Sequence, residues 1–524
     1  MASNESPSVP LPSHLARYVV DQDYQAYTPR DHAVWRHILH RLTGHLEDKA
    51  HPSYLEGLAA TGIGLERIPS LEEMNRKLAR LGWGAVAVRG FIPPAVFTEL
   101  QARGVLAIAA DIRTHEHIEY TPAPDIVHES AGHAPILKDA RYAAYLKRAG
   151  AVGFKAIASR EDRAVFEAIR TLSVVKEDPA SDGPDLVQAE RRLATALAGR
   201  TYVSESTKAS RLYWWTAEYG LVGTPERPRI YGAGLLSSIL EASHCLAPEV
   251  RRVPLSLACV EQDFDITRMQ PQLFVARDFD HLFEVVDAFE ATLAWRRGGD
   301  YGLDQAERAG TVNHLTLADG LEVSGQVARR LPGPPRGEGL DTLLAVLDGP
   351  AQVSRDGRSL LAEPWPGPVL VAFGRGGPPP AGPFRLDLPG GLQLGGVRRD
   401  GFRVGDLRGT LQGRPLDLPD SALLFVSAAL PSVAGGPADP EAWDRWFGDR
   451  ETFAAGEAED LARRRKAAAL PPRLAELYRE VARMRETGRI QAGRLAGIRE
   501  ELDRFPDDWL LRREVGELLG RPGT

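Results

Sequence analysis

The stretch with the densest set of residues that can bind a metal or act in catalysis is Tyr120-Thr-Pro-Ala-Pro-Asp-Ile-Val-His-Glu-Ser-Ala-Gly-His133. Asp125 is well placed to cap a helix that begins just after it, because a short polar side chain accepts hydrogen bonds from the first free backbone N–H groups. His128 and His133 then stand five residues apart, which separates them by about 140° around a regular helix. Both can reach one metal ion if the helix ends or deforms between them, and Gly132 permits such a deformation.

A second stretch, Tyr213-Trp-Trp-Thr-Ala-Glu218-Tyr-Gly, places a carboxylate inside an apolar, aromatic segment. Burying an unpaired carboxylate is costly, so we expect Glu218 to be paired or bound to a metal. One interpretation is a salt bridge to an arginine such as Arg211, with the two histidines satisfied inside a core helix. The other is the two-histidine, one-carboxylate triad of non-haem iron(II) oxygenases, which leaves coordination positions open for oxygen and a co-substrate.

The histidine spacing disfavours a zinc protease. In the H-E-x-x-H motif, a four-residue spacing stacks both ligands on one helix face, whereas His128 and His133 have one residue more between them. A metal-dependent hydrolase with the same ligands and Glu129 as its base stays an alternative, and so does a non-catalytic scaffold.

A third motif, Tyr231-Gly-Ala-Gly-Leu-Leu-Ser-Ser238, has small residues that allow a backbone to approach a ligand closely. It lacks the third glycine of a dinucleotide site.

Composition excludes several classes of function. A chain of 524 residues is too long for one ordinary core, so we expect two to four domains. The formal net charge of −7 argues against polyanion binding, and no nucleic-acid partner is expected. No apolar run reaches the roughly 20 residues of a spanning helix, and no secretory signal opens the chain, so we expect a cytoplasmic protein without a membrane partner. Because the only cysteines are Cys245 and Cys259, histidine and carboxylate must hold any metal.

Taken together and in this order, the three motifs resemble the biopterin-dependent aromatic amino acid hydroxylases. The resemblance runs from about Tyr27 to Gly302, apart from the 160–205 region, and also includes Ile68-Pro-Ser-Leu, Gly82-Trp83 and Gln270-Pro271. It implies that His128, His133 and Glu218 are the catalytic ligands of an iron(II) ion.

The resemblance also implies roles for residues around the metal. Positions that match substrate contacts or support for the ligands are Arg113, Thr121, Pro124, Asp125, Trp214, Tyr219, Ser237 and Ser238. Positions that match the pterin site are Gly90, Phe91, Ile92, Phe97 and Glu129. Arg113 would hold the substrate carboxylate as a planar fork, anchored by Asp125. Ser237 would bond the outer nitrogen of one histidine, and Phe97 would stack on the pterin.

The implied activity is hydroxylation of L-phenylalanine to L-tyrosine with O2, non-haem iron(II) and a tetrahydropterin, either tetrahydrobiopterin or a related bacterial pterin. Tryptophan or another aromatic amino acid is the alternative substrate. The chain departs from the family in the charged 160–205 stretch, and in Pro94 and Ala123, which replace polar residues. Family-like sequence begins within the first 30 residues, so no N-terminal regulatory domain is expected, as in bacterial members.

The pattern of apolar residues predicts a mainly α catalytic domain, then a small all-β module and a C-terminal helical segment. The expected boundaries are a disordered tail at 1–14, the hydroxylase domain at 15–305 with a helical insertion at 160–205, the β-rich module at 306–436 and the helical region at 437–524. Asp319-Gly320, between alternating runs, predicts a hairpin. Apolar stripes between 474 and 505 are more typical of an intramolecular core than of a dimer interface. Homo-oligomer formation through the insertion or the C-terminal region is a further expectation.

Overall fold

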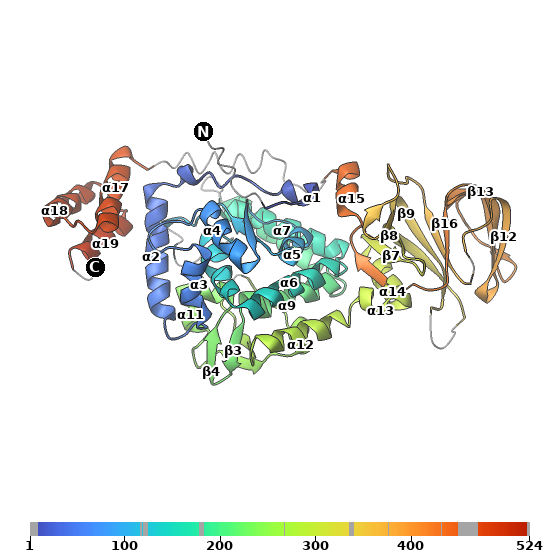
Figure 1. The fold of residues 1–524 in the computed structure, drawn as a ribbon, viewed down its shortest axis with the longest axis horizontal. Helices are drawn as coiled ribbons and strands as arrows, with labels where there is room; N and C mark the ends of the chain where they lie inside the picture. The colour runs from blue at the N-terminus through green and yellow to red at the C-terminus, as the bar shows by residue number, and fades with distance from the viewer. Residues whose placement is uncertain are drawn as a thin grey trace.

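The computed structural model describes residues 9–115, 118, 124–177, 183–266, 268–334, 340–375, 377–430, 432–448 and 470–520. Figure 1 shows three parts in a row, with a helical body in the middle, a sheet at one end and a small group of helices at the other. Residues 1–8 of the expected disordered tail lie outside the described residues.

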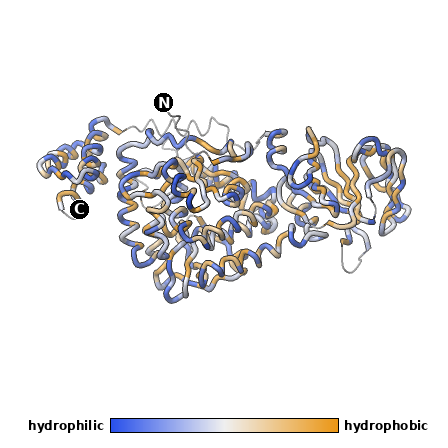
Figure 2. The backbone as a smooth tube through the Cα atoms, viewed as in Figure 1, coloured by the Kyte–Doolittle hydropathy of each residue, from blue (hydrophilic) through white to orange (hydrophobic). Residues whose placement is uncertain are grey.

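Helices form most of the central body. They are α1 (Ser13–Ala16), η1 (Tyr24–Ala26), α2 (Pro29–Leu46), α3 (Ser53–Thr61), α4 (Leu71–Leu78), η2 (Ala79–Leu81), α5 (Pro94–Ala102), η4 (Val127–His133), η5 (Pro135–Lys138), α6 (Ala140–Lys155), α7 (Arg160–Glu177), α8 (Gly183–Ala198), α9 (Glu205–Tyr213), η6 (Trp214–Glu218), α10 (Ala233–Leu236), α11 (Ile239–His244), η7 (Leu257–Glu261), α12 (Phe279–Glu290), α13 (Ala294–Arg297) and α14 (Gly299–Ala309). In Figure 2 these helices alternate between hydrophilic and hydrophobic colours, as amphipathic helices do.

Two small sheets complete the body, so the mainly α prediction is only partly matched. β1 (Gly84–Val88) pairs in parallel with β2 (Val105–Ala109). β3 (Leu221–Thr224), β4 (Arg227–Ile230), β5 (Arg251–Pro254) and β6 (Gln272–Ala276) form a sheet of order β4-β3-β6-β5. The strand β3 directly follows η6, which carries Glu218, and therefore ties that segment to the sheet.

The predicted insertion contains α7 and α8, which pack against each other. α7 buries Val165, Ala168 and Leu172. α8 is largely exposed, and its Val187 and Leu197 side chains keep nearly half of their area accessible, at 47% and 46%.

Beyond α14 the chain forms one sheet of 11 strands, larger than the small module expected. The strands are β7 (Val312–Thr316), β8 (Leu321–Pro332), β9 (Thr342–Arg355), β10 (Arg358–Ser359), β11 (Val369–Phe373), β12 (Gly382–Leu388), β13 (Leu392–Asp400), β14 (Arg403–Leu411), β15 (Arg414–Pro415), β16 (Ser421–Ser427) and β17 (Ser432–Gly435). A short helical turn, η8 (Pro389–Gly391), joins β12 to β13. The antiparallel pairing of β7 with β8 confirms the hairpin at Asp319-Gly320.

Alternation along the central strand β11 gives this sheet two cores. Val369, Val371 and Phe373 belong to one hydrophobic cluster, whereas Leu370 and Ala372 belong to another. Because successive side chains of a strand point to opposite faces, both faces of β11 are buried. The first cluster also contains residues of α13 and α14, so these helices cover one face of the sheet.

Residues 9–20, here called the N-terminal strap, are ordered, although residues up to 14 were expected to be disordered. Leu15 is fully buried in a cluster with β1, β2 and α5. His14 Nε2 lies 2.8 Å from Glu99 Oε2 on α5. The strap also contacts α15 (Pro440–Phe447), because Arg17 pairs with Asp444 at 2.5 Å. It therefore joins α5 to the helix that follows the large sheet.

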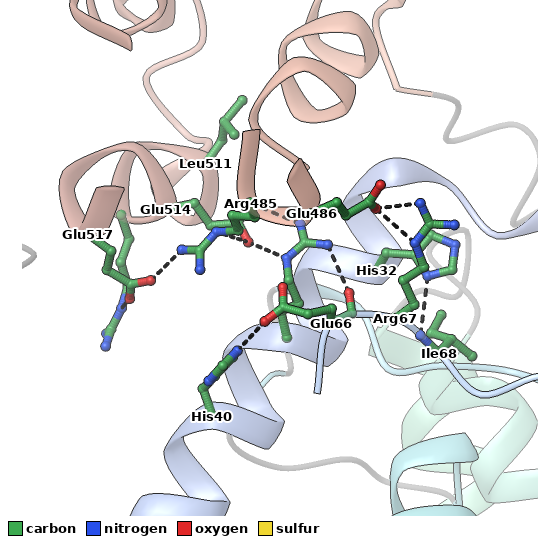
Figure 3. Close-up of polar contacts among 12 residues, drawn as sticks. His32, His40, Glu66, Arg67, Ile68, Arg485, Glu486, Leu511, Glu514 and Glu517 are labelled. Carbon is green, nitrogen blue, oxygen red and sulfur yellow. Dashed lines mark hydrogen bonds and ion pairs between the residues drawn. The ribbon is translucent and has the colours of Figure 1, made fainter. Parts of the chain in front are cut away.

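The C-terminal helices are α17 (Pro472–Thr487), α18 (Ala492–Glu501) and α19 (Trp509–Leu518), with the turn η9 (Leu502–Arg504). α17 and α19 pack on α2, and α18 packs on α19. Their apolar stripes are part of the same core cluster as the body, which confirms an intramolecular core. The contact includes a buried pair: Arg36 Nε and Nη2 donate to Glu514 Oε1 and Oε2 at 2.8 and 3.1 Å. Arg67, at the rim, donates to Glu486 (Figure 3).

Among the helices that the structure describes, none combines the length and apolar composition needed to span a membrane.

Glu514→Ala should detach the C-terminal helices. The variant leaves the Arg36 guanidinium buried without its carboxylate, and breaking a buried pair in this way costs about 3 kcal/mol of unfolding free energy. Urea unfolding and limited proteolysis measure the effect. The matched control is Glu486→Ala in the same contact, whose partner Arg67 is exposed, and its loss should stay below about 1 kcal/mol. Equal losses in the two variants would contradict the prediction.

His32 should make this contact sensitive to acid. Burial and then Arg36 lower the pKa of His32 from 6.5 to about 4, and its Nδ1 accepts a hydrogen bond from Ile68 N. The unfolded chain therefore takes up a proton first as the pH falls, and stability is lost between pH 6.5 and 4, by up to ~3 kcal/mol. Unfolding curves of His32→Gln at pH 7 and pH 5 should differ less than those of the wild type; an unchanged difference would refute the assignment.

Candidate metal centre and active site

Both ligand-bearing segments are π-helical. η4 contains His128 and His133, and η6 ends at Glu218. In a π-helix the hydrogen bond runs from residue i to i+5, so residues five apart lie one turn apart. Tyr219 N donates such a bond to Trp214 O at 2.8 Å. The deformation that the histidine spacing requires is therefore a π-helix, and π-helical turns are often found at functional sites.

Glu218 lies between the two histidines. Its Oε1 is 3.2 Å from His133 Nε2, and its Oε2 is 3.3 Å from His128 Nε2. The imidazole rings are perpendicular, with centroids 5.1 Å apart. One ligand atom from each of the three residues lies within 4.8 Å of the others, which is close enough for one ion.

The charges of the three side chains suit a cation. Burial raises the pKa of Glu218, but His133 and His128 more than offset this and hold it well below its usual value. Burial lowers the pKa of His128, but the Glu218 carboxylate outweighs burial and raises that pKa to about 9. The site therefore attracts positive charge, and a metal cation can replace the bound protons, because neutral imidazole nitrogens and a carboxylate oxygen form a donor set that iron(II) accepts.

The salt-bridge interpretation of Glu218 is wrong. Arg211 Nη2 lies 3.4 Å from Asp263 Oδ1, and Arg211 Nη1 donates to Val260 O. In the described part of the chain no arginine or lysine pairs with Glu218. The largely buried carboxylate is compensated by the two histidines, and a bound metal would take over that role.

Ser237 orients His128. Its Oγ donates to Ala233 O at 2.8 Å and lies 3.0 Å from His128 Nδ1, so it accepts the proton of that nitrogen. The Nε2 lone pair of His128 is then directed away from the serine and is free for a metal. His133 Nδ1 is buried and has no hydrogen-bond partner among the described residues.

Asp125 joins Arg113 to the metal-bearing segment. Its Oδ2 accepts from Arg113 N at 3.0 Å and Nε at 2.8 Å, and its Oδ1 accepts from Nη2 at 2.9 Å. Oδ1 also accepts from His128 N at 3.1 Å, the cap expected from the sequence. Burial raises the pKa of Asp125, but Arg113 outweighs this and lowers it below its usual value.

Two further residues expected at the substrate pocket come just before this cap in the sequence. Thr121 lies outside the described residues, and Pro124 directly precedes Asp125.

The third motif serves the ligand-bearing backbone. A Cβ added to Gly232 would lie 2.5 Å from Glu218 O, and one added to Gly132 would lie 2.7 Å from Ala233 O. Only glycine lets η4, η6 and α10 approach this closely. Gly132 is thus needed for packing as well as for local geometry. Ser238 caps α11 by accepting from Glu241 N.

One of the expected pterin residues, Phe97, contacts Tyr213. Phe97 meets Tyr213 edge to face at 5.4 Å, and the Tyr213 ring is 6.3 Å from that of His133. Gly90 and Phe91 lie in the loop between β1 and α5, and Ile92 packs against the cluster under the N-terminal strap.

Glu129 is placed beside the second histidine. Its Oε2 is 3.9 Å from His133 Nε2. Burial raises the pKa of Glu129, and His128 and His133 only partly offset this.

Sequence reasoning missed three residues of this site: Tyr213, Gln101 and Phe264. Gln101 Nε2 donates to Tyr213 OH at 2.5 Å. Tyr213 opens the Tyr-Trp-Trp run, so its position next to Trp214 could have indicated it. Phe264 stacks on Trp214 at 4.2 Å, but it lies far along the chain, where no local motif points to the site.

Comparisons with known proteins show the family of the chain. A model of the biopterin-dependent aromatic amino acid hydroxylase family matches residues 19–167 and 185–301. Two relatives named phenylalanine-4-hydroxylase are each 32% identical. The one from Pseudomonas aeruginosa aligns over 52% of this chain and 87% of its own, and the one from Mesorhizobium japonicum over 56% and 91%. The chain belongs to the biopterin-dependent aromatic amino acid hydroxylase family.

A solved structure of phenylalanine hydroxylase from Chromobacterium violaceum, with bound iron(III) and 7,8-dihydrobiopterin, is 28% identical. It covers 54% of this chain and 92% of its own, with a TM-score of 0.42.

Glu218→Ala should abolish tight binding of iron(II) while the fold survives, because the anionic ligand is lost and the two imidazoles remain. Anaerobic iron titration and circular dichroism measure the two effects. Ser237→Ala should weaken iron binding about 10- to 100-fold through the orientation of His128. The control is Glu290→Gln, a buried glutamate on α12 that pairs with Arg148. Retained iron in Glu218→Ala would contradict the ligand assignment.

Proposed function

We propose that this chain hydroxylates L-phenylalanine to L-tyrosine with O2, iron(II) and a tetrahydropterin. The observation that carries the proposal is the placement of Glu218 at 3.2–3.3 Å from both histidines in a member of the biopterin-dependent family. Its relatives with 32% identity, aligned over nearly their whole length, are named phenylalanine-4-hydroxylases.

In this proposal His128, His133 and Glu218 hold the iron. Bound iron and tetrahydropterin together supply the activation of O2, while the protein supplies positions and a dry pocket. Ser237 keeps the proton of His128 on Nδ1, so that Nε2 stays a ligand. Glu129, whose pKa is raised by burial, holds or accepts a proton beside the pterin.

Arg113 is proposed to bind the substrate carboxylate. Asp125 accepts from Nε and from one N–H of Nη2 and fixes the plane of the guanidinium, which leaves the edge formed by Nη1 and Nη2 for the substrate carboxylate. The same aspartate caps the segment that carries the histidines, so the substrate and metal positions are coupled through one side chain. The pocket around the ring would be completed by Thr121, Pro124, Trp214, Tyr219 and Ser238.

The pterin is proposed to lie against Gly90, Phe91, Ile92 and Phe97, with Glu129 near its ring. The ring contacts from Phe97 through Tyr213 to His133 support this position, because they connect α5 to the metal ligands. A cofactor that stacks on Phe97 would therefore be close to the iron.

For the rest of the chain, we infer accessory roles for residues 306–436 and 437–524, and for the whole protein a cytoplasmic location. The family match stops at residue 301 and omits residues 168–184, which lie in the insertion. Homo-oligomer formation through the 160–205 insertion or the C-terminal region stays a prediction that sedimentation or light scattering can test.

The iron-loaded protein should form tyrosine from phenylalanine with a reduced pterin. Turnover of phenylalanine, tryptophan and tyrosine, followed by product chromatography, identifies the substrate. Absence of any hydroxylated product would overturn the proposal, and zinc-dependent hydrolysis without oxygen uptake would favour a hydrolase.

Arg113→Lys should raise the KM for the amino acid about 10-fold or more, because a lysine cannot replace the fork. The KM for the pterin should stay close to its wild-type value, which separates substrate binding from general damage. A change confined to kcat would contradict the proposed role of Arg113.

A further inference from the structure

Trp214 is the middle ring of a three-ring stack. The Tyr219 ring lies 4.5 Å from it at an interplanar angle of 26°, and the Phe264 ring lies 4.2 Å from it at 9°. Two rings that lay flat on one face of an indole at these distances would overlap each other. Tyr219 and Phe264 therefore cover opposite faces of Trp214.

Covering both faces leaves only the edge of Trp214 for another molecule. That edge carries Nε1, which is buried and has no hydrogen-bond partner among the described residues. A tryptophan N–H that is buried normally finds an acceptor. This edge of the ring thus carries a donor for which the described residues provide no acceptor.

The stack is close to the metal ligands. Trp214 begins the π-helical segment that ends at Glu218, and the bond from Tyr219 N to Trp214 O closes one turn of it. Trp214 and Glu218 therefore lie about one turn apart on the same element, and Tyr219 directly follows the ligand. Any tilt of the Trp214 ring would change the wall beside the metal.

Phe264 is fixed from both sides along its own segment. Before it, Trp215 Nε1 donates to Gln262 O at 2.9 Å, and Arg211 pairs with Asp263 at 3.4 Å. After it, Gln270 Nε2 donates to Asp265 O at 2.7 Å. The ring is thus held in place rather than left to rotate with a loose loop.

We propose that Phe264 is a positioning residue that sets substrate specificity. It locks the plane of Trp214, so that the substrate ring meets the edge of this wall and not its face. A locked wall cannot tilt to widen the pocket, which favours the single ring of phenylalanine over the larger indole of tryptophan. The inference rests on the proposed function, since it concerns the same pocket.

The test uses the full-length, iron-loaded protein and a reduced pterin. kcat and KM are measured for L-phenylalanine and L-tryptophan, together with the tyrosine formed per pterin oxidised. The variants are Phe264→Ala, Phe264→Leu, which keeps bulk without a ring, and Phe264→Tyr, which keeps the ring. The matched control is Phe402→Ala, because Phe402 is also half-buried and packs on another ring, Phe425, at 4.5 Å in the large sheet.

Phe264→Ala and Phe264→Leu should lower kcat/KM for phenylalanine about 5-fold, the size expected for the loss of one aromatic pair. The preference for phenylalanine over tryptophan should fall by a similar factor, with less tyrosine formed per pterin. Phe264→Tyr should restore both values to within about 2-fold of wild type, because it retains the stack. Iron content should stay unchanged in all variants.

Two results would overturn the inference alone: an unchanged preference in Phe264→Ala with an active wild type, or an equal change in Phe402→Ala. A wild-type protein that hydroxylates none of the aromatic amino acids overturns the proposed function, and this inference with it. The two failures are thus distinguished by the wild-type measurement.

Discussion

The largely buried carboxylate of Glu218 between two imidazoles is the constraint on which the active-site architecture depends. A carboxylate in this position is costly unless opposite charge surrounds it. His128 and His133 provide that charge only because a π-helix brings residues five apart onto one side, and Ser237 and Asp125 then hold this helix from two directions. The glycines at 132 and 232 let the supporting backbone segments approach to distances that no other residue would allow.

The chemistry of the site could be predicted from sequence better than its geometry. His128, His133 and Glu218 lie within short motifs whose residue types suit a metal, and the structure brings them together. The structure confirms that the helix deforms so that both histidines face one ion, but the form of this deformation, a π-helix, could not be predicted, because the choice between an α-helix and a π-helix depends on tertiary packing. Phe264 could not be found, since its stacking on Trp214 is decided by the fold of a distant segment.

Beyond the site, local patterns predicted elements but not their extent. The hairpin at Asp319-Gly320 follows from turn chemistry, whereas the assembly of 11 strands into one sheet depends on pairings between distant segments. The order of residues 9–14 depends likewise on contacts with α5 and α15. Glu205 illustrates how the parts are joined: its buried carboxylate accepts from the backbone N–H groups of Ile157 and Ala294, which belong to the core of the large sheet.

The N-terminal strap has a consequence for the order of assembly during synthesis. Arg17 and Asp444 are partners separated by more than 400 positions, so the ion pair between the strap and α15 forms only after almost the entire polypeptide has been made. The apolar contacts of the strap with β1, β2 and α5 involve only residues before 110 and can form much earlier. A nascent product that ends before α15 would therefore hold all the metal ligands and a packed strap, and would lack the ion pair that ties this strap to the helix after the large sheet.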